Sequence, residues 1–311
     1  ENLFYTVDVT NPDRDDEHVM VKGQVNGLTS ASTASVPDNA NYEDMAAVMA
    51  AGFSVDGNLS HSGAQTEFAV TSRSDNMSGN SSTGSGNFAF TMNADEIAYS
   101  VSAMDTQLNM VVPDLPFPVE LTMEETGFDF KLPVARTDQP QDFRFAVTLG
   151  GFAVPDMIWG MFDPAGQLSH DPATIAFDVT GKVRVLADIF NPEELDDDVP
   201  GELHELTING LTVRAAGAEL TGAGAFTFDN SDLVSFDGMP RPEGALNLAL
   251  TGGNALLDTL VAMGFIPEDQ ANGTRMMIGM FAVPGDGPDS LASTIEVNEE
   301  GHVLANGQRL K

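Results

Sequence analysis

The chain has 311 residues, and its 13 lysines and arginines against 47 aspartates and glutamates give a formal net charge of −34. This charge excludes general nucleic-acid binding by phosphate neutralisation, and it disfavours electrostatic docking on an anionic membrane. The chain contains no cysteine, so disulfides, thiol catalysis and thiolate metal sites are excluded. Hydrophobic residues make up 42% of the chain, which is enough for a sizeable core.

Two features bear on the cellular setting. No apolar run approaches the 18 residues that a transmembrane helix needs, so we expect no transmembrane segment. The chain begins at Glu1 without a methionine or a signal peptide, so we interpret it as a processed product or a fragment.

Period-two alternation of apolar and polar residues recurs from Phe68 to Val297 and indicates β-strands with one dry face. Because short turns join consecutive strands, the pattern predicts an antiparallel meander. At one of the turns, Asn209-Gly210, the apolar parity slips, which indicates either a tight hairpin or a bulge. The dipeptides that predict turns are Asp56-Gly57, Thr126-Gly127, Asn209-Gly210, Glu300-Gly301 and Asn306-Gly307.

The longest alternating stretch runs from Ala173 to Ile189. A strand of this length is far longer than the usual five or six residues, about 20 Å. It predicts a large sheet that is open, rolled or barrel-like, with one whole face in need of an apolar partner. The chain as a whole is therefore expected to be one elongated, mainly β domain over residues 1–311.

Four segments have helical patterns, at 42–51, 155–162, 254–263 and 268–281. Asn41 is the expected N-cap of the first, and Gly52 and Gly264 are expected to end the first and third. The helices resemble one another in pairs, since MAAVMAAGF is similar to DTLVAMGF and MIWGMF to MIGMF. This pairing suggests a duplicated unit with halves at about 1–150 and 151–311.

Three polar segments are predicted to be loops. Ser72 to Asn87 is a low-complexity stretch expected to form a long loop or hairpin tip. Asn11 to Glu17 and Glu193 to Val199 are acidic loops. The first contains Asp13, Asp15, Asp16 and Glu17, but their spacing is not that of a twelve-residue calcium loop, so a solvated acidic turn is the preferred interpretation.

The sequence offers no catalytic motif. The five histidines lie at no metal-ligand spacing, and no nucleophile elbow, phosphate-binding loop or dinucleotide-binding loop is present. Carboxylate pairs such as Glu124-Glu125 carry little information among 47 acidic residues, so a hydrolase is the weakest hypothesis. We therefore predict no enzyme, no catalytic residue, no metal and no cofactor.

The candidate site is apolar. Methionines and aromatic residues on the helices are most simply core residues, but they also suit an adaptable lining for an apolar ligand. Together with the dry faces of several strands they form a predicted ligand-binding set. Its members are Phe143, Phe145, Val147, Phe177, Val179, Phe226 and Phe228 on strands, and Met157, Trp159, Met161, Met277, Met280 and Phe281 on helices.

Several segments carry a family resemblance: LPFPVELTMEETGF (115–128), FDPAGQL (162–168), FDNSDL with GMPRP (228–242), MGFIPEDQA (263–271) and NEEGHVLANGQRL (298–310). They resemble an uncharacterised family of secreted or periplasmic Gram-negative proteins, the domain of unknown function numbered 2125. The closing hairpin after a β-meander is also similar, more weakly, to AsmA-like periplasmic proteins. The second resemblance implies long curved sheets with an apolar inner face, in some members associated with lipid handling. Neither resemblance implies any catalytic residue.

The leading hypothesis is a non-enzymatic periplasmic or secreted envelope protein that binds a lipid or another apolar ligand in a β-sheet groove. The alternative is a structural or interaction protein, completed by self-association or by an envelope partner at its sheet face or edges.

Overall fold

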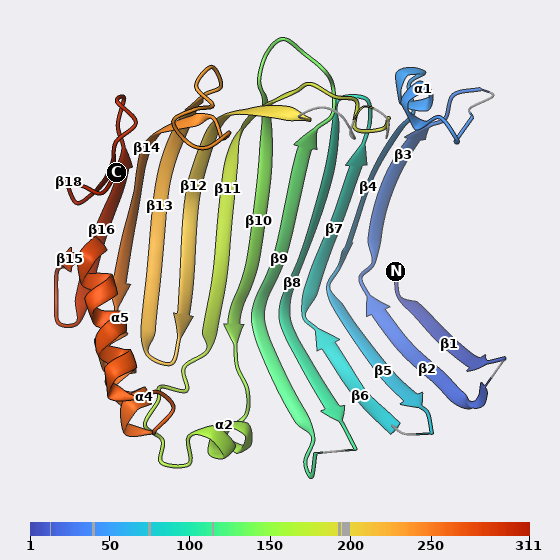
Figure 1. Ribbon diagram of the computed structural model, residues 1–311. Helices are drawn as coiled ribbons and strands as arrows, with labels where there is room; N and C mark the ends of the chain where they lie inside the picture. The colour runs from blue at the N-terminus through green and yellow to red at the C-terminus, as the bar shows by residue number, and fades with distance from the viewer. Residues whose placement is uncertain (13, 39–40, 74–75, 114, 192–193, 195–199) are drawn as a thin grey trace.

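The computed structural model describes residues 1–311 except 13, 39–40, 74–75, 114, 192–193 and 195–199. Within the described residues, 18 strands form one antiparallel sheet that does not close on itself, and four helices accompany it. This confirms the predicted mainly β, curved meander and selects the open form among the three forms expected (Figure 1). The strands are β1 (Leu3–Asn11), β2 (Arg14–Asn26), β3 (Thr29–Ser35), β4 (Ser54–His61), β5 (Gly63–Thr71), β6 (Asn76–Thr83), β7 (Ser85–Met92), β8 (Glu96–Val111), β9 (Val119–Pro133), β10 (Gln141–Phe152), β11 (Ala173–Val185), β12 (Gly201–Ala215), β13 (Ala218–Asp229), β14 (Arg241–Thr251), β15 (Val283–Pro284), β16 (Ser290–Val297), β17 (Val303–Ala305) and β18 (Gln308–Arg309). The helices are α1 (Met45–Ala50), α2 (Asp156–Phe162), α4 (Gly253–Ala262) and α5 (Glu268–Phe281).

The N-terminal part of the sheet is a meander of long strands that are each broken in the middle. β8 pairs with β7 along its first half and with β6 along its second half. The same division continues outward, with β7, β4 and β3 in one branch and β6, β5, β2 and β1 in the other. The two branches diverge at the right of Figure 1, whereas β8 to β14 form an unbranched sheet.

The breaks lie at one level of the sheet, which we call the crease. At this level Gly27, Asp105 and Gly151 have positive φ values of 60°, 52° and 61°. Residues with positive φ interrupt the alternation of a strand and bend it, as in β-bulges. On six neighbouring strand paths, three of which contain these residues, the positions on the apolar face advance by three residues at the crease instead of two. The three-residue steps join Val25 to Leu28, His61 to Ala64, Thr83 to Gly86, Ala103 to Thr106, Met123 to Thr126 and Leu149 to Phe152.

The described helices cover only part of the apolar face. Met277 and Phe281 of α5 line a cavity of about 470 Å³ with Leu248, Leu250 and Leu291 of the sheet. Only ten hydrophobic residues among those described are buried, including Val48 and Met49 of α1. The protein therefore has a thin core for its length.

The solvent-accessible surface area of the chain is large, as expected for a protein with a thin core. It exposes 18387 Å², whereas a compact monomer of 32.9 kDa exposes about 12,500 Å². The excess, about half as much again, is the area that a second layer would cover in an ordinary sandwich. Within the described residues, much of the apolar face of this single-layer sheet thus has no second layer over it.

Several boundary predictions were wrong. The strand expected at Ala173–Ile189 ends at Val185, because Leu186 and Ala187 both donate to the carbonyl of Pro200 and the chain then turns. At Asn209-Gly210, where a tight hairpin or a bulge was expected, the structure has a bulge, since the register with β11 and β13 shifts there. Glu300-Gly301 and Asn306-Gly307 lie between strands as predicted.

The segment Ser72–Asn87, predicted to be a long loop or hairpin tip, is instead mostly strand, because it contains β6 and the first three residues of β7. Its serines and asparagines pair with β5 and β8 through backbone hydrogen bonds, which do not require apolar side chains. Asp56-Gly57 and Thr126-Gly127 were wrongly predicted to be turns, since both lie within strands. Asn11–Glu17, expected to be an acidic loop, is mostly strand with a short turn, and Asp13 lies outside the described residues. Of Glu193–Val199, only Glu194 is described.

The helices lie where the sequence predicted, with small shifts at their starts. α1 begins at Met45 because the side chain of Asp44, not Asn41, accepts the N–H of Ala47 at 2.9 Å. Gly52 and Gly264 have φ values of 96° and 77°, the left-handed conformation with which glycine ends helices.

Candidate apolar groove

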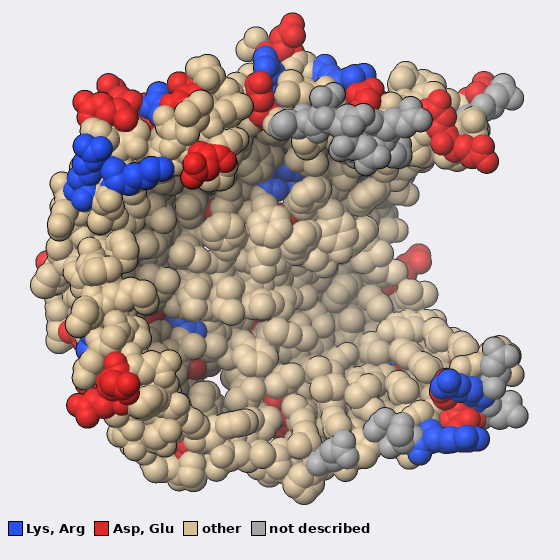
Figure 2. All heavy atoms as spheres, viewed as in Figure 1, with Lys and Arg blue, Asp and Glu red and all other residues tan. Residues whose placement is uncertain are grey.

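The hollowed face of the molecule is mostly free of charged side chains, which gather at its rim (Figure 2). The register places five aromatic residues in a row across neighbouring strands β7 to β11 on this face. Their ring centroids are 5.3, 5.8, 5.7 and 6.4 Å apart in turn, the spacing of edge-to-face aromatic contacts. The five residues are Phe88, Tyr99, Phe128, Phe145 and Phe177.

A second row on the same face lies one step nearer the crease. Leu149, Ile175 and Val213 are direct cross-strand neighbours on β10, β11 and β12. Their exposed fractions are 41%, 50% and 38%, although their alternation marks them as inward-facing residues of a core. Contiguous exposed apolar residues on a concave surface are the usual form of a binding site for an apolar ligand. We call this surface, from the aromatic row to Leu149, Ile175 and Val213, the apolar groove.

The structure brings the predicted strand residues onto this one face. Phe143 pairs with Gly181 and packs over it, Phe145 pairs with Val179, and Val147 pairs with Phe177. Val179 is buried at 6% exposure, whereas Phe145 is 36% exposed, so the first supports the floor and the second is open to a ligand.

Two other predicted strand residues lie toward the C-terminal side. Phe226 pairs with Leu206 and Gly244, and Phe228 lines a separate cavity of about 580 Å³ near the rim. That Phe143, Phe145, Val147, Phe177, Val179, Phe226 and Phe228 contact a ligand stays a prediction.

The predicted helix residues divide into two groups. Met277 and Phe281 face the sheet in the cavity beneath α5, and Met280 is 62% exposed. On α2, Met157 and Met161 are 56% and 59% exposed, so neither packs in a core.

Trp159 of α2 has a structural role. Its ring stacks on His170 with centroids 4.4 Å apart and an interplanar angle of 7°. His170 also lies 3.4 Å from the carboxylate of Asp163, whose side chain is fully buried. Asp163 accepts the N–H groups of Gln167 and Leu168 at 2.9 and 2.7 Å, and these two bonds, with a smaller contribution from His170, lower its pKa. The cluster fixes the turn after α2 and thereby positions that helix.

A second carboxylate, that of Asp289, anchors the start of α4. Asp289 accepts the N–H groups of Asn254 and Ala255 at 3.1 and 2.8 Å, and the bond from Ala255 is the main cause of its lowered pKa. Arg275 of α5 donates to Asn254 and Asp258, which ties α5 to α4. The covering helices are thus anchored by charge-assisted hydrogen bonds.

The opposite face of the same strands is polar. Cross-strand ion pairs join Lys131 to Glu96 at 2.7 Å and Arg144 to Asp178 at 3.0 Å. This contrast gives the sheet one face suited to water and one suited to an apolar ligand. In the part of the chain that the structure describes, no group of three histidine, cysteine, aspartate or glutamate residues is arranged to hold a metal ion. Of the helices described, none has both the length and the hydropathy to cross a bilayer.

The sequence analysis did not name several groove residues. Phe88, Tyr99 and Phe128 belong to alternating strands, but the sequence does not reveal which strands become neighbours or how they align. Exposed apolar residues on the loop after β13, notably Val234 and Met239, were missed as well, because a single loop carries no periodic signal.

Comparison with known proteins gives one match. A family model described as an uncharacterized protein conserved in bacteria (DUF2125) matches residues 35–307. No curated protein and no solved structure matches the chain.

Proposed function

From the premise that the chain belongs to this uncharacterised bacterial family, we propose that it is a non-enzymatic envelope protein, periplasmic or secreted, that binds lipid acyl chains in the apolar groove. The observation that carries the proposal is the exposed row of Leu149, Ile175 and Val213 beside the aromatic row. The family match supports a bacterial protein, and the compartment and the AsmA-like likeness are part of the proposal.

Acyl chains suit this surface for a physical reason. Burial of apolar area yields about 25 cal/mol per Å², and it needs no hydrogen-bond partners. The groove floor offers mainly aliphatic and aromatic side chains, and the largest apolar patch on an ordinary monomer is only about 300–600 Å². A flexible chain follows a concave surface across several strands more readily than a rigid polar ligand does.

The test is to purify the protein, extract it with organic solvent and measure bound lipid by native mass spectrometry, then titrate delipidated protein with a fluorescent fatty acid. In Ile175→Asp we expect roughly tenfold weaker fatty-acid binding, because a charge enters the apolar surface. Ala223→Asp is the matched control, since it adds the same charge on exposed residue 223 of the opposite face. Wild-type protein that carries no lipid and binds no fatty acid overturns the proposal.

A second candidate function rests on the edge strand β1. Its residues are almost all exposed, it pairs with β2 alone among the described strands, and it includes Phe4 at 69% and Val9 at 54% exposure. Exposed apolar edge strands invite pairing with another chain. Sedimentation across salt concentrations tests self-association, which high salt promotes by screening the charge of −34. A monomer at every salt concentration contradicts it.

A further inference from the structure

The loop between β13 and β14, residues 230–240, exposes apolar side chains at one rim of the sheet. Val234 is 89% exposed, Met239 64% and Leu233 49%. The loop stands above the ends of the strands in Figure 1. We call Leu233, Val234 and Met239 the rim tip.

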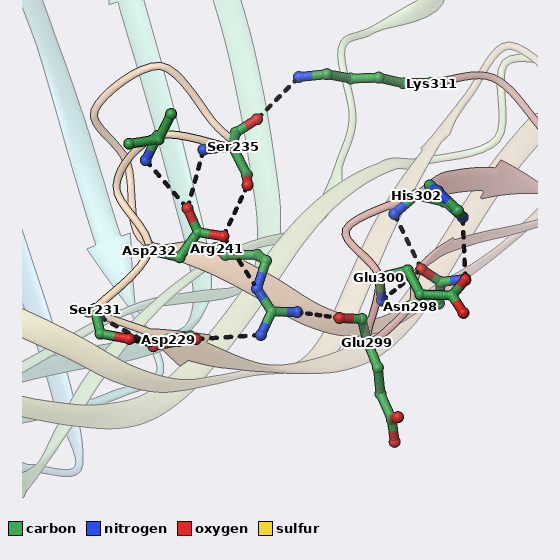
Figure 3. Close-up of polar contacts among 11 residues, drawn as sticks. Asp229, Ser231, Asp232, Ser235, Arg241, Asn298, Glu299, Glu300, His302 and Lys311 are labelled. Carbon is green, nitrogen blue, oxygen red and sulfur yellow. Dashed lines mark hydrogen bonds and ion pairs between the residues drawn. The ribbon is translucent and has the colours of Figure 1, made fainter.

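The rim tip is held by a rigid polar frame (Figure 3). Asp232 accepts the N–H groups of Val234 and Ser235 at 3.1 and 3.0 Å, which lowers its pKa together with the bond from the Ser235 hydroxyl. Arg241 contacts both Asp232 and Asp229 and donates to the carbonyl of Glu299 at 2.6 Å.

The end of the chain braces the loop from the other side. Lys311 donates to the carbonyl of Ser235 at 3.2 Å, and its ammonium lies 4.8 Å from the ring centroid of Phe236. These hydrogen bonds hold the loop in a conformation that keeps the side chain of Val234 exposed to solvent.

A mostly apolar cavity lies between the rim tip and the sheet. The cavity of about 580 Å³ beside the loop is lined by Leu233, Phe236 and Met239 on the loop side, and by Leu203 and Phe228 on the sheet side. Phe228 follows Phe226 on the apolar face of β13, so this cavity continues the face that carries the groove.

We propose that the rim tip inserts into the surface of a zwitterionic phospholipid bilayer and that the adjoining cavity is where an acyl chain enters the sheet. This inference rests on the proposed lipid-binding function. The rim tip covers on the order of a few hundred Å², too little for a specific protein interface, which needs about 1,000 Å² or more. A bilayer needs no shape complementarity, and insertion of a few apolar side chains is enough for reversible binding. The net charge of −34 opposes anionic bilayers.

The first experiment measures docking through a single labelled position. The chain has no cysteine, so Val234→Cys can be labelled with an environment-sensitive fluorophore. Val36→Cys is the matched control because Val36 is 58% exposed and directly follows β3, on the opposite side of the sheet from β13 and β14 (Figure 1). With phosphatidylcholine vesicles we expect a blue shift and higher intensity at position 234 and no change at position 36. Equal responses at both positions, or none at 234, overturn the proposal.

The second experiment separates docking from ligand binding. The variant Val234→Asp is expected to bind phosphatidylcholine vesicles roughly tenfold less while it binds a soluble fluorescent fatty acid as wild type does, since Val234 does not line the cavity. The substitution is at an exposed position, and circular dichroism checks that the fold is kept. If wild-type protein binds fatty acid but not vesicles, the rim-tip proposal fails and the groove proposal stands. If it binds vesicles but no fatty acid, the groove proposal fails instead.

Discussion

The C-terminal end and the middle of the sheet carry the same apolar pattern, but among the described helices α5 covers only the first. At the C-terminal end, α5 lies over Leu248 and Leu250 of β14 and Leu291 of β16, and Val297 of β16, paired with both β14 and β17, is 7% exposed. In the middle, Ile175 and Val213 have equivalent inward-facing positions and remain 50% and 38% exposed. Alternation of apolar and polar residues along a strand therefore identifies the apolar face of the sheet. It does not reveal whether helices of the same chain pack on that face.

The largest effect expected from this comparison is on stability. Val297→Ala should lower the free energy of unfolding by about 2 kcal/mol, because it removes two buried methyl groups and leaves a cavity. Val213→Ala, the same change on the uncovered part, should cost less than about 1 kcal/mol. Urea unfolding of both variants provides the measurement. Equal losses would mean that the middle of the sheet is covered in solution.

The anchoring of the covering helices should have a somewhat smaller effect. Asp289→Ala removes the acceptor for Asn254 and Ala255 at the start of α4 and should cost about 1.5 kcal/mol. Asp286→Ala is the control, because residue 286 is exposed and lies in the same connection. A loss as large in the control as in Asp289→Ala would contradict the anchoring role.

Acid should lower the free energy of unfolding through two aspartates, Asp163 after α2 and Asp289 at the start of α4, in the same pH range. Hydrogen bonds to Asp163 and Asp289 lower their pKa, so their contribution to stability is complete above the unfolded aspartate pKa of about 3.9. It is lost as pH falls through the lower folded pKa values. Between pH 7 and 5 these two groups should contribute no change, which thermal unfolding at a series of pH values can check. In Asp163→Asn the decline below pH 4 should be shallower than in wild type.

The smallest effect is expected on the polar face. Arg144→Ala removes an exposed ion pair with Asp178 and should change the free energy of unfolding by about 0.5 kcal/mol or less. Fatty-acid binding should be unchanged, since Arg144 lies on the face opposite Phe145. A strong loss of binding would show that the ligand occupies the polar face.

The sequence predicted those features that depend on long, regular alternation. The β-rich meander, the apolar parity of Phe143 to Leu149, the four helices and the glycines that end two of them all follow from local patterns. The β6–β7 segment was missed because its serines pair through the backbone, with no apolar signal. Thr126-Gly127 was mistaken for a turn because it lies beside the crease, where the alternation of apolar and polar residues along β9 is interrupted.

The candidate site was predictable only in part. Phe145 and Phe177 could be assigned to one face from parity alone. Their alignment with Phe88, Tyr99 and Phe128 depends on the register of five strands, and the exposure of the groove depends on how little of it the described helices cover. Neither property is encoded in a local window of sequence.

The crease has a mechanical consequence. Since six strand paths bend at one level, the two branches of the sheet meet along a single line, and rotation about that line leaves the hydrogen-bond ladders on either side intact. The softest deformation of this sheet is therefore a change in the angle between its branches. A change in this angle would alter the width of the sheet's opening while the strands on both sides of the crease keep their backbone hydrogen bonds.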